Sequence, residues 1–457
     1  MKMKKNKIRV ISAVVSAIML ASSASVFAKF DAYNDTDGFT LGHYEVEVNQ
    51  EQRADTEKLY EQRPKNEKQF ENLSRGLVAV PGENGTLVSW RFLGTDSNSL
   101  TYNLYCSGEK LNDKPITTTN FFHTGASKNA EYTLKEVENG EETGVEYTTT
   151  AWDKNYIGFK VTEREGYNID DGAVADLDGD GEYEILLRRV PSMDVNTRTS
   201  YPVIEAYKTD GTHMWTIDIG PNEINEVDIN FLAYDMDGDG KAEVIMRSFE
   251  GTTDGKGNTT GDTNGDEITD YSKSESNLAI FKERQYIVST PEFLSIYDGE
   301  TGEETDRTDL KPSKEPLSDW SYRYSDTGRL TKRASHYLFG LAYLDGVTPS
   351  VVMVRGAWDN VRAAAWHIED GKFKEDWVHN TENKDDVNSI WGACNHNLVT
   401  VDVDFDGKDE ILSGPMAIDH DGSEMYAVKV YDNDGNAQKL AHGDAFDVAK
   451  TDPDFNG

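Results

Sequence analysis

The stretch "VADLDGDGEYEIL", residues 174–186, decides the fold, because it places alternating aspartates and glycines between two apolar, strand-like ends. Three aspartates and two glutamates this close together repel one another unless a cation neutralises them. The same plan returns in "LAYDMDGDGKAEVIMR" (232–247) and in "VTVDVDFDGKDEILSG" (399–414). The chain therefore repeats a unit that consists of a strand, an acidic loop and a second strand.

In every copy the acidic residues occupy positions one, three, five and nine of the loop, and glycine stands at position six. Alternate carboxylates with a later closing carboxylate suit Ca²⁺, which takes about six to eight oxygen ligands. A plain Asp-Gly turn is the alternative for one loop, but three copies with the same closing glutamate favour Ca²⁺ in a structural role. The predicted ligands are Asp176, Asp178, Asp180, Glu184, Asp235, Asp237, Asp239, Glu243, Asp402, Asp404, Asp406 and Glu410. A looser acidic loop, "TTDGKGNTTGDTNGDEITD" (252–270), could bind another ion.

The long interval between the second and third acidic loops leaves room for repeats that lack the acids. The stretch "SHYLFGLAYLDGVTPSVVMVRG" (335–356) fits such a copy, with strands on both sides of a loop. Four-stranded units that recur at roughly 40–60 residues are typical of a β-propeller, whereas the repeats of a β-helix are shorter. Residues 161–457 are therefore predicted to form an all-β, Ca²⁺-binding β-propeller.

The region before this repeat differs in texture. Short alternating runs such as "GTLVSWRFL" and "LTYNLYCSG" predict a small fibronectin type III-like β-sandwich over residues 73–160. Residues 29–72 are polar and are interpreted as a partly helical leader or linker with weak structure. Residues 1–28 have a basic start, a short apolar run and small residues before Ala28, which is the pattern of a signal peptide. The run is short for a membrane anchor, which needs ~20 residues.

The net charge of −37 argues against binding of nucleic acid or of an anionic membrane. Together with the signal peptide it predicts a secreted, extracellular protein with no membrane attachment after cleavage. We expect a monomer.

Several blocks, in this order, resemble the rhamnogalacturonan lyases of polysaccharide lyase family 11: "VSWRFLGTD", "AYLDG…PS", "NHN" and "HGDA". The resemblance covers about residues 73–457. It implies a fibronectin-like sandwich, an eight-bladed Ca²⁺-rich propeller with a central cleft, and eliminative cleavage of pectin between rhamnose and galacturonate. The partner it implies is an acidic plant polysaccharide, rhamnogalacturonan.

Elimination requires a base for the proton on carbon-5 of the uronate and a positive group for its carboxylate. In the blocks that resemble the family, Arg355 is the expected carboxylate clamp, and His396 and His442 are each a base or a metal ligand. The expected substrate-binding residues are Asn395, Asn397, Asp444, Trp358 and Trp391. The alternative for each is a structural residue that links blades.

Two departures from the family pattern support an alternative function. The segment "NEINEVDINF" (222–231) has Glu223, Val227 and Asp228 where the family has a segment similar to "IRAGAHYTQF". The chain ends at "DPDFNG", where the family continues, so we expect the C-terminal blades to be missing. The alternative is a catalytically inactive or fragmentary Ca²⁺ propeller that binds polysaccharide or acts as a surface interaction module. A hydrolase is a third possibility, but no carboxylate pair outside the acidic loops supports it.

Overall fold

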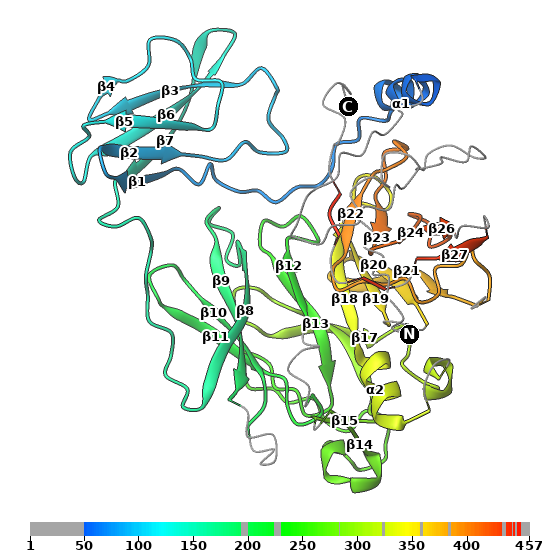
Figure 1. Cartoon of the computed structure of the whole chain (residues 1–457). Coiled ribbons are helices and arrows are strands. Elements are labelled where there is room, and N and C mark those ends of the chain that lie inside the picture. Colours follow the sequence, from blue (N-terminus) through cyan, green and yellow to red (C-terminus); the bar gives the residue numbers. More distant parts are fainter. Residues whose placement is uncertain are drawn as a thin grey trace, which may run out of the picture. The chain divides into compact units, whose positions relative to one another are not determined.

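The computed structural model describes residues 50–192, 200–223, 230–282, 284–321, 325–356, 360–382, 385–431, 436–440, 442–443 and 446–448. The predicted signal peptide, Trp358 and Asp444 lie outside the described residues. Within them nearly all of the regular secondary structure is strand (Figure 1), apart from the helices α1 (Gln50–Gln62) and α2 (Thr327–Ser335) and short 3₁₀ helices. The all-β prediction is therefore confirmed.

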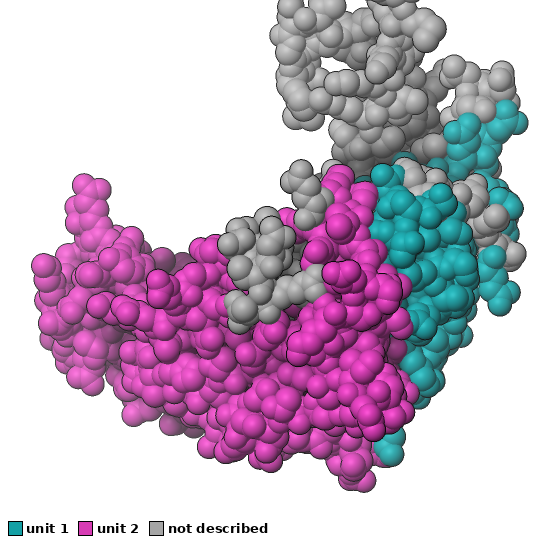
Figure 2. All heavy atoms as spheres, turned by 90° about the horizontal axis from the view of Figure 1, so that it is seen from below, with its two compact units in different colours: residues 1–68, 311–367, 374–457 teal, residues 69–310, 368–373 magenta. Residues whose placement is uncertain are grey.

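The chain divides into two compact units, which Figure 2 colours separately. One unit contains residues 1–68, 311–367 and 374–457, and the other contains residues 69–310 and 368–373. Among the described residues, no helix is both long and apolar enough to cross a membrane.

Two small antiparallel sheets in the second of these units share one apolar core. The first sheet has the order β1-β2-β5 and the second has the order β4-β3-β6-β7. Alternating apolar side chains from both sheets, such as Val88, Tyr102 and Leu134, are buried together. The strands are β1 (Val78–Gly82), β2 (Gly85–Ser89), β3 (Thr101–Cys106), β4 (Glu109–Lys110), β5 (Asn120–Thr124), β6 (Glu131–Glu138) and β7 (Glu141–Thr150). The fibronectin-like assignment of this module stays a prediction.

The same unit continues with two four-stranded antiparallel sheets. The orders are β11-β10-β9-β8 and β12-β13-β16-β17, with the hairpin β14–β15 between β13 and β16 along the chain. Leu186, Ile204 and Val244 belong to an apolar core to which both sheets contribute. The strands are β8 (Tyr167–Ala175), β9 (Glu184–Pro191), β10 (Val203–Tyr207), β11 (His213–Asp218), β12 (Phe231–Tyr234), β13 (Glu243–Phe249), β14 (Leu278–Phe281), β15 (Arg284–Ile287), β16 (Glu292–Tyr297) and β17 (Glu304–Asp309).

The other unit contains two further sheets of the same kind, with the strand orders β18-β19-β20-β21 and β22-β23-β24-β25. Every residue of β19, "SVVMVR", is buried, as expected of a β-branched strand between two neighbours. The strands are β18 (Tyr337–Ala342), β19 (Ser350–Arg355), β20 (Arg362–Glu369), β21 (Lys372–Asn380), β22 (Val399–Val401), β23 (Glu410–Leu412), β24 (Met416–Ile418), β25 (Glu424–Ala427), β26 (Lys429–Tyr431) and β27 (Ala437–Lys439). Residues 368–373, at the β20–β21 turn, belong to the other unit. No closed propeller is found among the described residues.

Candidate functional site

The three acidic loops connect the first two strands of three of these sheets. In each loop the first aspartate accepts hydrogen bonds from backbone N–H groups further along the loop. The N···O distances are 2.8 Å from Gly179 and 2.7 Å from Gly181 to Asp176, 2.7 Å from Gly238 and 3.0 Å from Gly240 to Asp235, and 3.1 Å from Gly407 to Asp402. The glycines at position six have φ between +86° and +93°, a conformation that glycine adopts without strain.

The closing glutamate is the first residue of the strand that follows each loop. One of its carboxylate oxygens accepts the N–H of the second loop residue, which turns the side chain back over the loop. The N···O distances are 2.9 Å from Leu177 to Glu184, 2.9 Å from Met236 to Glu243 and 2.7 Å from Val403 to Glu410. The predicted nine-residue arrangement is therefore closed in space as well as in sequence.

In each loop three carboxylates lie close enough to share one cation, and the closing glutamates Glu184 and Glu243 are not among them. In the first two loops the three aspartates each place an oxygen within 4.8 Å of the others. In the third loop Asp402, Asp404 and Glu410 do so, and Asp406 lies with Glu410 and His420 in a second group. His420 is a possible ligand that the loop spacing could not reveal.

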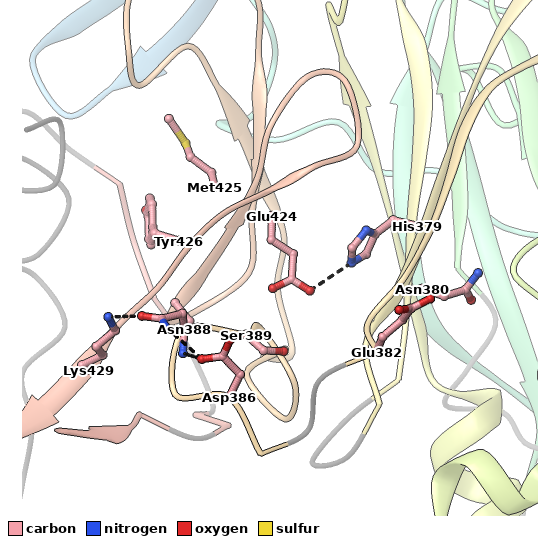
Figure 3. A pocket seen from close by; sticks show the side chains of 11 residues that line it. His379, Asn380, Glu382, Asp386, Asn388, Ser389, Glu424, Met425, Tyr426 and Lys429 are labelled. Atoms are coloured by element: carbon pink, nitrogen blue, oxygen red, sulfur yellow. Dashed lines mark hydrogen bonds and ion pairs between the residues drawn. The ribbon is translucent and has the colours of Figure 1, made fainter. Parts of the chain in front are cut away.

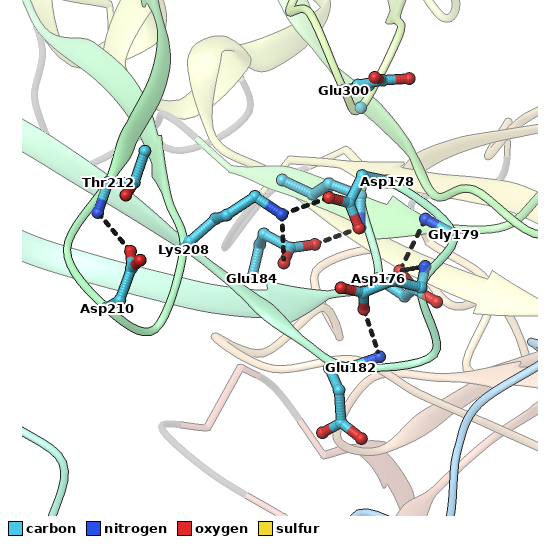
Figure 4. Close-up of polar contacts among 12 residues, drawn as sticks. Asp176, Asp178, Gly179, Glu182, Glu184, Lys208, Asp210, Thr212 and Glu300 are labelled. Carbon is cyan, nitrogen blue, oxygen red and sulfur yellow. Dashed lines mark hydrogen bonds and ion pairs between the residues drawn. The ribbon is translucent and has the colours of Figure 1, made fainter.

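Several loop carboxylates have a buried oxygen without a hydrogen-bond donor among the described residues, which is the environment expected if a cation binds there. Asp178 Oδ1, Asp402 Oδ1 and Glu410 Oε1 are buried and accept no hydrogen bond from the described residues. Such oxygens are costly to bury unless a positive charge approaches them. In the first loop Lys208 reaches Asp178 and lies 4.0 Å from Glu184 (Figure 4). The donor set is all oxygen in the first two loops and suits a hard divalent cation.

Two of the closing glutamates make the stability of the cation-free protein depend on pH. Burial raises the pKa of Glu243 and of Glu410 from 4.5 to about 8, and repulsion from the loop aspartates adds to the rise. Since the folded chain holds these protons more tightly, their stabilising contribution is full below pH 4.5 and is lost as the pH rises through about 8. With EGTA present, we expect the thermal midpoints of both units to fall over this window, because each unit contains one of the two glutamates, and excess Ca²⁺ to abolish the fall. A midpoint in EGTA that rises with pH would contradict this assignment.

Residues 64–74, most of which the sequence assigns to a weakly structured linker, contact the backs of the acidic loops. They form no helix or strand, but their polar groups bind loop carbonyls or carboxylates. The hydrogen bonds are Asn66 Nδ2 to Gly407 O (2.9 Å) and Lys68 Nζ to Asp409 Oδ1 (3.0 Å) in one unit, and Gln69 Nε2 to Met236 O (3.2 Å) and Ser74 N to Gly181 O (2.9 Å) in the other. We call residues 64–74 the loop-backing segment.

Three histidines from separate segments converge in the unit that contains β18–β25. His442 Nε2 lies 3.2 Å from His396 Nε2, and the His396 and His336 ring centroids are 5.4 Å apart. His442 Nδ1 contacts the carbonyl oxygen of Cys394, which can only accept a hydrogen bond. The Nδ1 atom of His442 therefore donates this hydrogen bond, and in the neutral ring the Nε2 atom is the acceptor, which faces His396 Nε2. This is the tautomer of a metal ligand or of a general base.

The predicted pair His396 and His442 is thus brought together, and His336 is an addition. His336 lies between α2 and β18, and it is buried, whereas His396 is exposed. A lone histidine at the start of a strand carries no local signal, so the sequence alone could not assign it to the cluster.

Asn395 and Asn397 hold the backbone on both sides of His396. Asn395 is 2% exposed, and its Oδ1 accepts the N–H of Gly443 at 2.7 Å. Asn397 Nδ2 donates to Phe446 O at 2.8 Å. Both amides therefore connect the "NHN" block to the segment that carries His442, a positioning role, and their contact with substrate stays a prediction.

Arg355 ends strand β19 beside the histidines but is fully buried, with 0% exposure. The strand register pairs it with Tyr337 on one side and with Arg362 on the other. Gly356, the next residue, donates its N–H to the carbonyl of His336 at 2.8 Å. The sheet thus brings Arg355 to the same strand ends as His336, and its role as a carboxylate clamp stays a prediction.

Two pockets lie in this unit near β21 and β25. A pocket of about 550 Å³, shown in Figure 3, is lined by polar side chains, among them His379 and Glu424, whose Nε2 and Oε1 atoms are 3.3 Å apart. A second pocket, of about 630 Å³, has Trp391 and Arg362 in its wall. Trp391, a predicted sugar platform, therefore lines the same pocket as the Arg362 side chain. Neither His396 nor His442 lines either of these pockets.

Comparison with known proteins finds two matching families. Residues 158–457 match the model described as "Rhamnogalacturonan lyase family 11, C-terminal domain". Residues 68–152 match "Rhamnogalacturonan I lyases beta-sheet domain". The division between the two matches falls between β7 and β8.

Curated relatives and solved structures agree with these matches. The rhamnogalacturonan endolyase YesW and the rhamnogalacturonan exolyase YesX of Bacillus subtilis (strain 168) are 37% identical over 401 residues and 36% identical over 406 residues. These alignments cover 84% and 85% of this chain but 60% and 61% of the relatives, so the chain spans about 60% of their length. The crystal structure of the exotype lyase YesX has a TM-score of 0.70 at 37% identity, and covers 84% of this chain and 61% of its own. The Bacillus licheniformis "Rhamnogalacturonan Lyase PL11" has a TM-score of 0.68 at 37% identity, with 83% and 62% covered.

Proposed function

This chain is a member of rhamnogalacturonan lyase family 11, and from that membership we propose that it cleaves rhamnogalacturonan by β-elimination with Ca²⁺ as its bound cation. The observation that carries the proposal is the imidazole pair: His442 Nδ1 faces the carbonyl oxygen of Cys394, and its Nε2 lies 3.2 Å from His396 Nε2. A base so oriented is what removal of the uronate carbon-5 proton requires. The relatives named endolyase and exolyase support the same reaction class.

The proposed reaction balances within the polymer. His442 Nε2 takes the proton from carbon-5, the electron pair forms a double bond between carbon-4 and carbon-5, and the bond from carbon-4 to the glycosidic oxygen breaks. That oxygen then takes a proton, for which the imidazolium of the histidine pair is a source. A Ca²⁺ ion at a uronate carboxylate would disperse the negative charge that builds up there. Ca²⁺ held by the carboxylates of the three loops would stabilise the fold and supply none of these steps.

The finer architecture belongs to the proposal too. We propose that the four-stranded sheets are blades of a β-propeller over residues 161–457, preceded by a fibronectin-like sandwich over 73–160. The sheet orders, which follow the chain, and the two family matches support this division. We also propose that residues 1–28 direct secretion, that residues 29–72 form the leader, and that the protein acts outside the cell as a monomer on pectic polysaccharide.

A Ca²⁺-binding module without turnover is the second candidate. The surroundings of Glu223 weaken one of the arguments for it. Glu223, in the segment that departs from the family pattern, is only 5% exposed and accepts a hydrogen bond from Arg247. Its charge is therefore compensated inside its own unit. Val227 and Asp228 lie outside the described residues.

The full chain incubated with rhamnogalacturonan and Ca²⁺ is expected to produce a rising ultraviolet absorbance, because elimination leaves a conjugated, unsaturated uronate. EGTA should abolish the rise, and dialysis back into Ca²⁺ should restore it. A matched incubation with a neutral galactan serves as the control, since it has no uronate to eliminate. Folded, Ca²⁺-loaded protein that binds the polymer but gives no rise would favour the silent module instead.

A further inference from the structure

A fourth loop, "DTNGDEITD" (residues 262–270), is separate from the three acidic loops but has the same spacing of oxygen-bearing side chains. Oxygen-bearing side chains again occupy positions one, three, five and nine: Asp262, Asn264, Asp266 and Asp270. Gly265 at position four and Glu267 at position six have φ of +79° and +65°. The first two acidic loops have left-handed residues at the same two positions, with φ of +79° at Gly179 and +86° at Gly181, and of +79° at Gly238 and +93° at Gly240.

The hydrogen bonds of this loop repeat those of the others. Asp262 Oδ1 accepts the N–H of Gly265 at 2.7 Å, and its Oδ2 accepts the N–H of Glu267 at 2.8 Å. Asn264 Oδ1 accepts the N–H of Asp266 at 2.9 Å. The backbone therefore directs the same side chains to the same side as in the predicted calcium loops.

The closing carboxylate comes from a different place. Asp270, at position nine, is turned away to cap a 3₁₀ helix, η3 (Tyr271–Lys273), through Ser272 N at 3.1 Å. Glu250, the residue after β13, takes over its task. Its Oε1 accepts the N–H of Thr263, the second loop residue, at 2.7 Å. Glu184, Glu243 and Glu410 make the equivalent bond in the other loops.

The second carboxylate oxygen of Glu250 is evidence that this loop binds a ligand. Glu250 is 0% exposed, and its Oε2 accepts no hydrogen bond from any described residue. One oxygen each from Glu250, Asp262 and Asp266 lies within 4.8 Å of the others. Burial of a charged carboxylate oxygen without a donor is unfavourable unless a cation meets it.

We infer that Glu250, Asp262, Asn264 and Asp266 form a further binding site for a divalent cation, Ca²⁺ by its all-oxygen donor set. The site joins the end of β13 to a loop that lies before β14. It would order the long connection between two neighbouring strands of one sheet, β13 and β16. The sequence could not define it, because its closing ligand lies outside the loop.

The inference is tested by the Ca²⁺ content of the full chain after equilibrium dialysis at a concentration that saturates the wild type. Glu250→Gln keeps the side-chain shape and the acceptor for Thr263 but removes the charge. We expect it to bind one Ca²⁺ fewer per chain than the wild type. The exposed Glu275→Gln serves as the matched control and should bind the wild-type number. A Glu250→Gln chain that is folded and holds the full number of ions would overturn the inference.

A second variant covers the case in which Glu250→Gln does not fold. Asp266 is exposed, so Asp266→Asn should fold, and it too should lose one Ca²⁺ per chain. Tyr271 gives a local signal because its hydroxyl donates to Asp266 Oδ2 at 2.8 Å. With Tb³⁺ as the probe, Tyr271→Phe should lower tyrosine-sensitised luminescence while the Ca²⁺ number is unchanged. An unchanged Ca²⁺ number in Asp266→Asn would count against the site.

Discussion

Removal of Ca²⁺ with EGTA should lower the two thermal transitions of the protein by unequal amounts. The first two acidic loops lie in the unit that contains β8–β17, and the third lies in the other unit. A bound ion at ~100 times its dissociation constant stabilises the folded state by ~2.7 kcal/mol. For domains of this size ~1 kcal/mol corresponds to ~2–4 °C. Counting the acidic loops alone, we expect falls of about 10–20 °C for the unit with two loops and about 5–10 °C for the other, measured by calorimetry. The cation site inferred at Glu250 lies in the unit with two loops and would add to the larger fall.

Single variants can separate the two transitions. In the presence of Ca²⁺, Glu410→Gln should lower only the transition temperature of the unit with the third loop. Glu243→Gln should lower only the transition temperature of the unit with the first two loops. Glu165→Gln, an exposed glutamate outside every loop, is the matched control and should change neither. If EGTA left both transitions in place, the carboxylate clusters would have to be neutralised in another way, and the calcium interpretation of the loops would fail.

Replacement of His442 by alanine should lower the turnover of rhamnogalacturonan by about 10²–10⁴-fold, the usual contribution of a general base. The reason is geometric: the contact with Cys394 O fixes the proton on Nδ1 and leaves Nε2 as the acceptor. The structure gives His442 no core position, so the thermal midpoint should change little. The measurement is kcat and KM from the rise in ultraviolet absorbance, with the loss confined to kcat.

His367→Ala is the matched control for this variant. His367 lies on β20, and its Nδ1 is 2.7 Å from Asp376 Oδ1 on β21, in a hydrogen bond distant in sequence from the "NHN" and "HGDA" blocks. Its loss should leave kcat within about twofold, as for a surface substitution. A His442→Ala chain as active as His367→Ala would remove His442 from the reaction and leave His396 as the candidate base.

The turn geometry of the acidic loops follows from local signals in the sequence, and the role of their carboxylates as Ca²⁺ ligands stays a prediction. Ligands at positions one, three, five and nine and a glycine at position six follow from one stretch of backbone. The cation site at Glu250 and the histidine cluster could not be predicted in this way. Glu250 reaches its loop across a separate connection, and His336 meets His396 only because β18 and the "NHN" block are brought together by the fold.

The burial of individual side chains, such as Arg355, could not be predicted from the sequence pattern either. Arg355 ends a run of apolar residues, and a terminal arginine on a strand is as compatible with an exposed clamp as with a buried one. The structure buries it between β18 and β20. The sequence predicts a partly helical leader or linker with weak structure over residues 29–72, whereas residues 64–72 form no helix or strand and their side chains bind loop carbonyls.

The loop-backing segment has a consequence for how such chains can recombine during evolution. It precedes the first strand of the N-terminal module, yet its hydrogen bonds go to acidic loops that lie after that module in the chain. A gene fusion that exchanged the N-terminal module at the start of β1 would keep these bonds, whereas an exchange that began before residue 64 would delete them. Viable hybrids within the family should therefore carry their crossover after residue 74, and the segment should be inherited with the acidic loops it contacts.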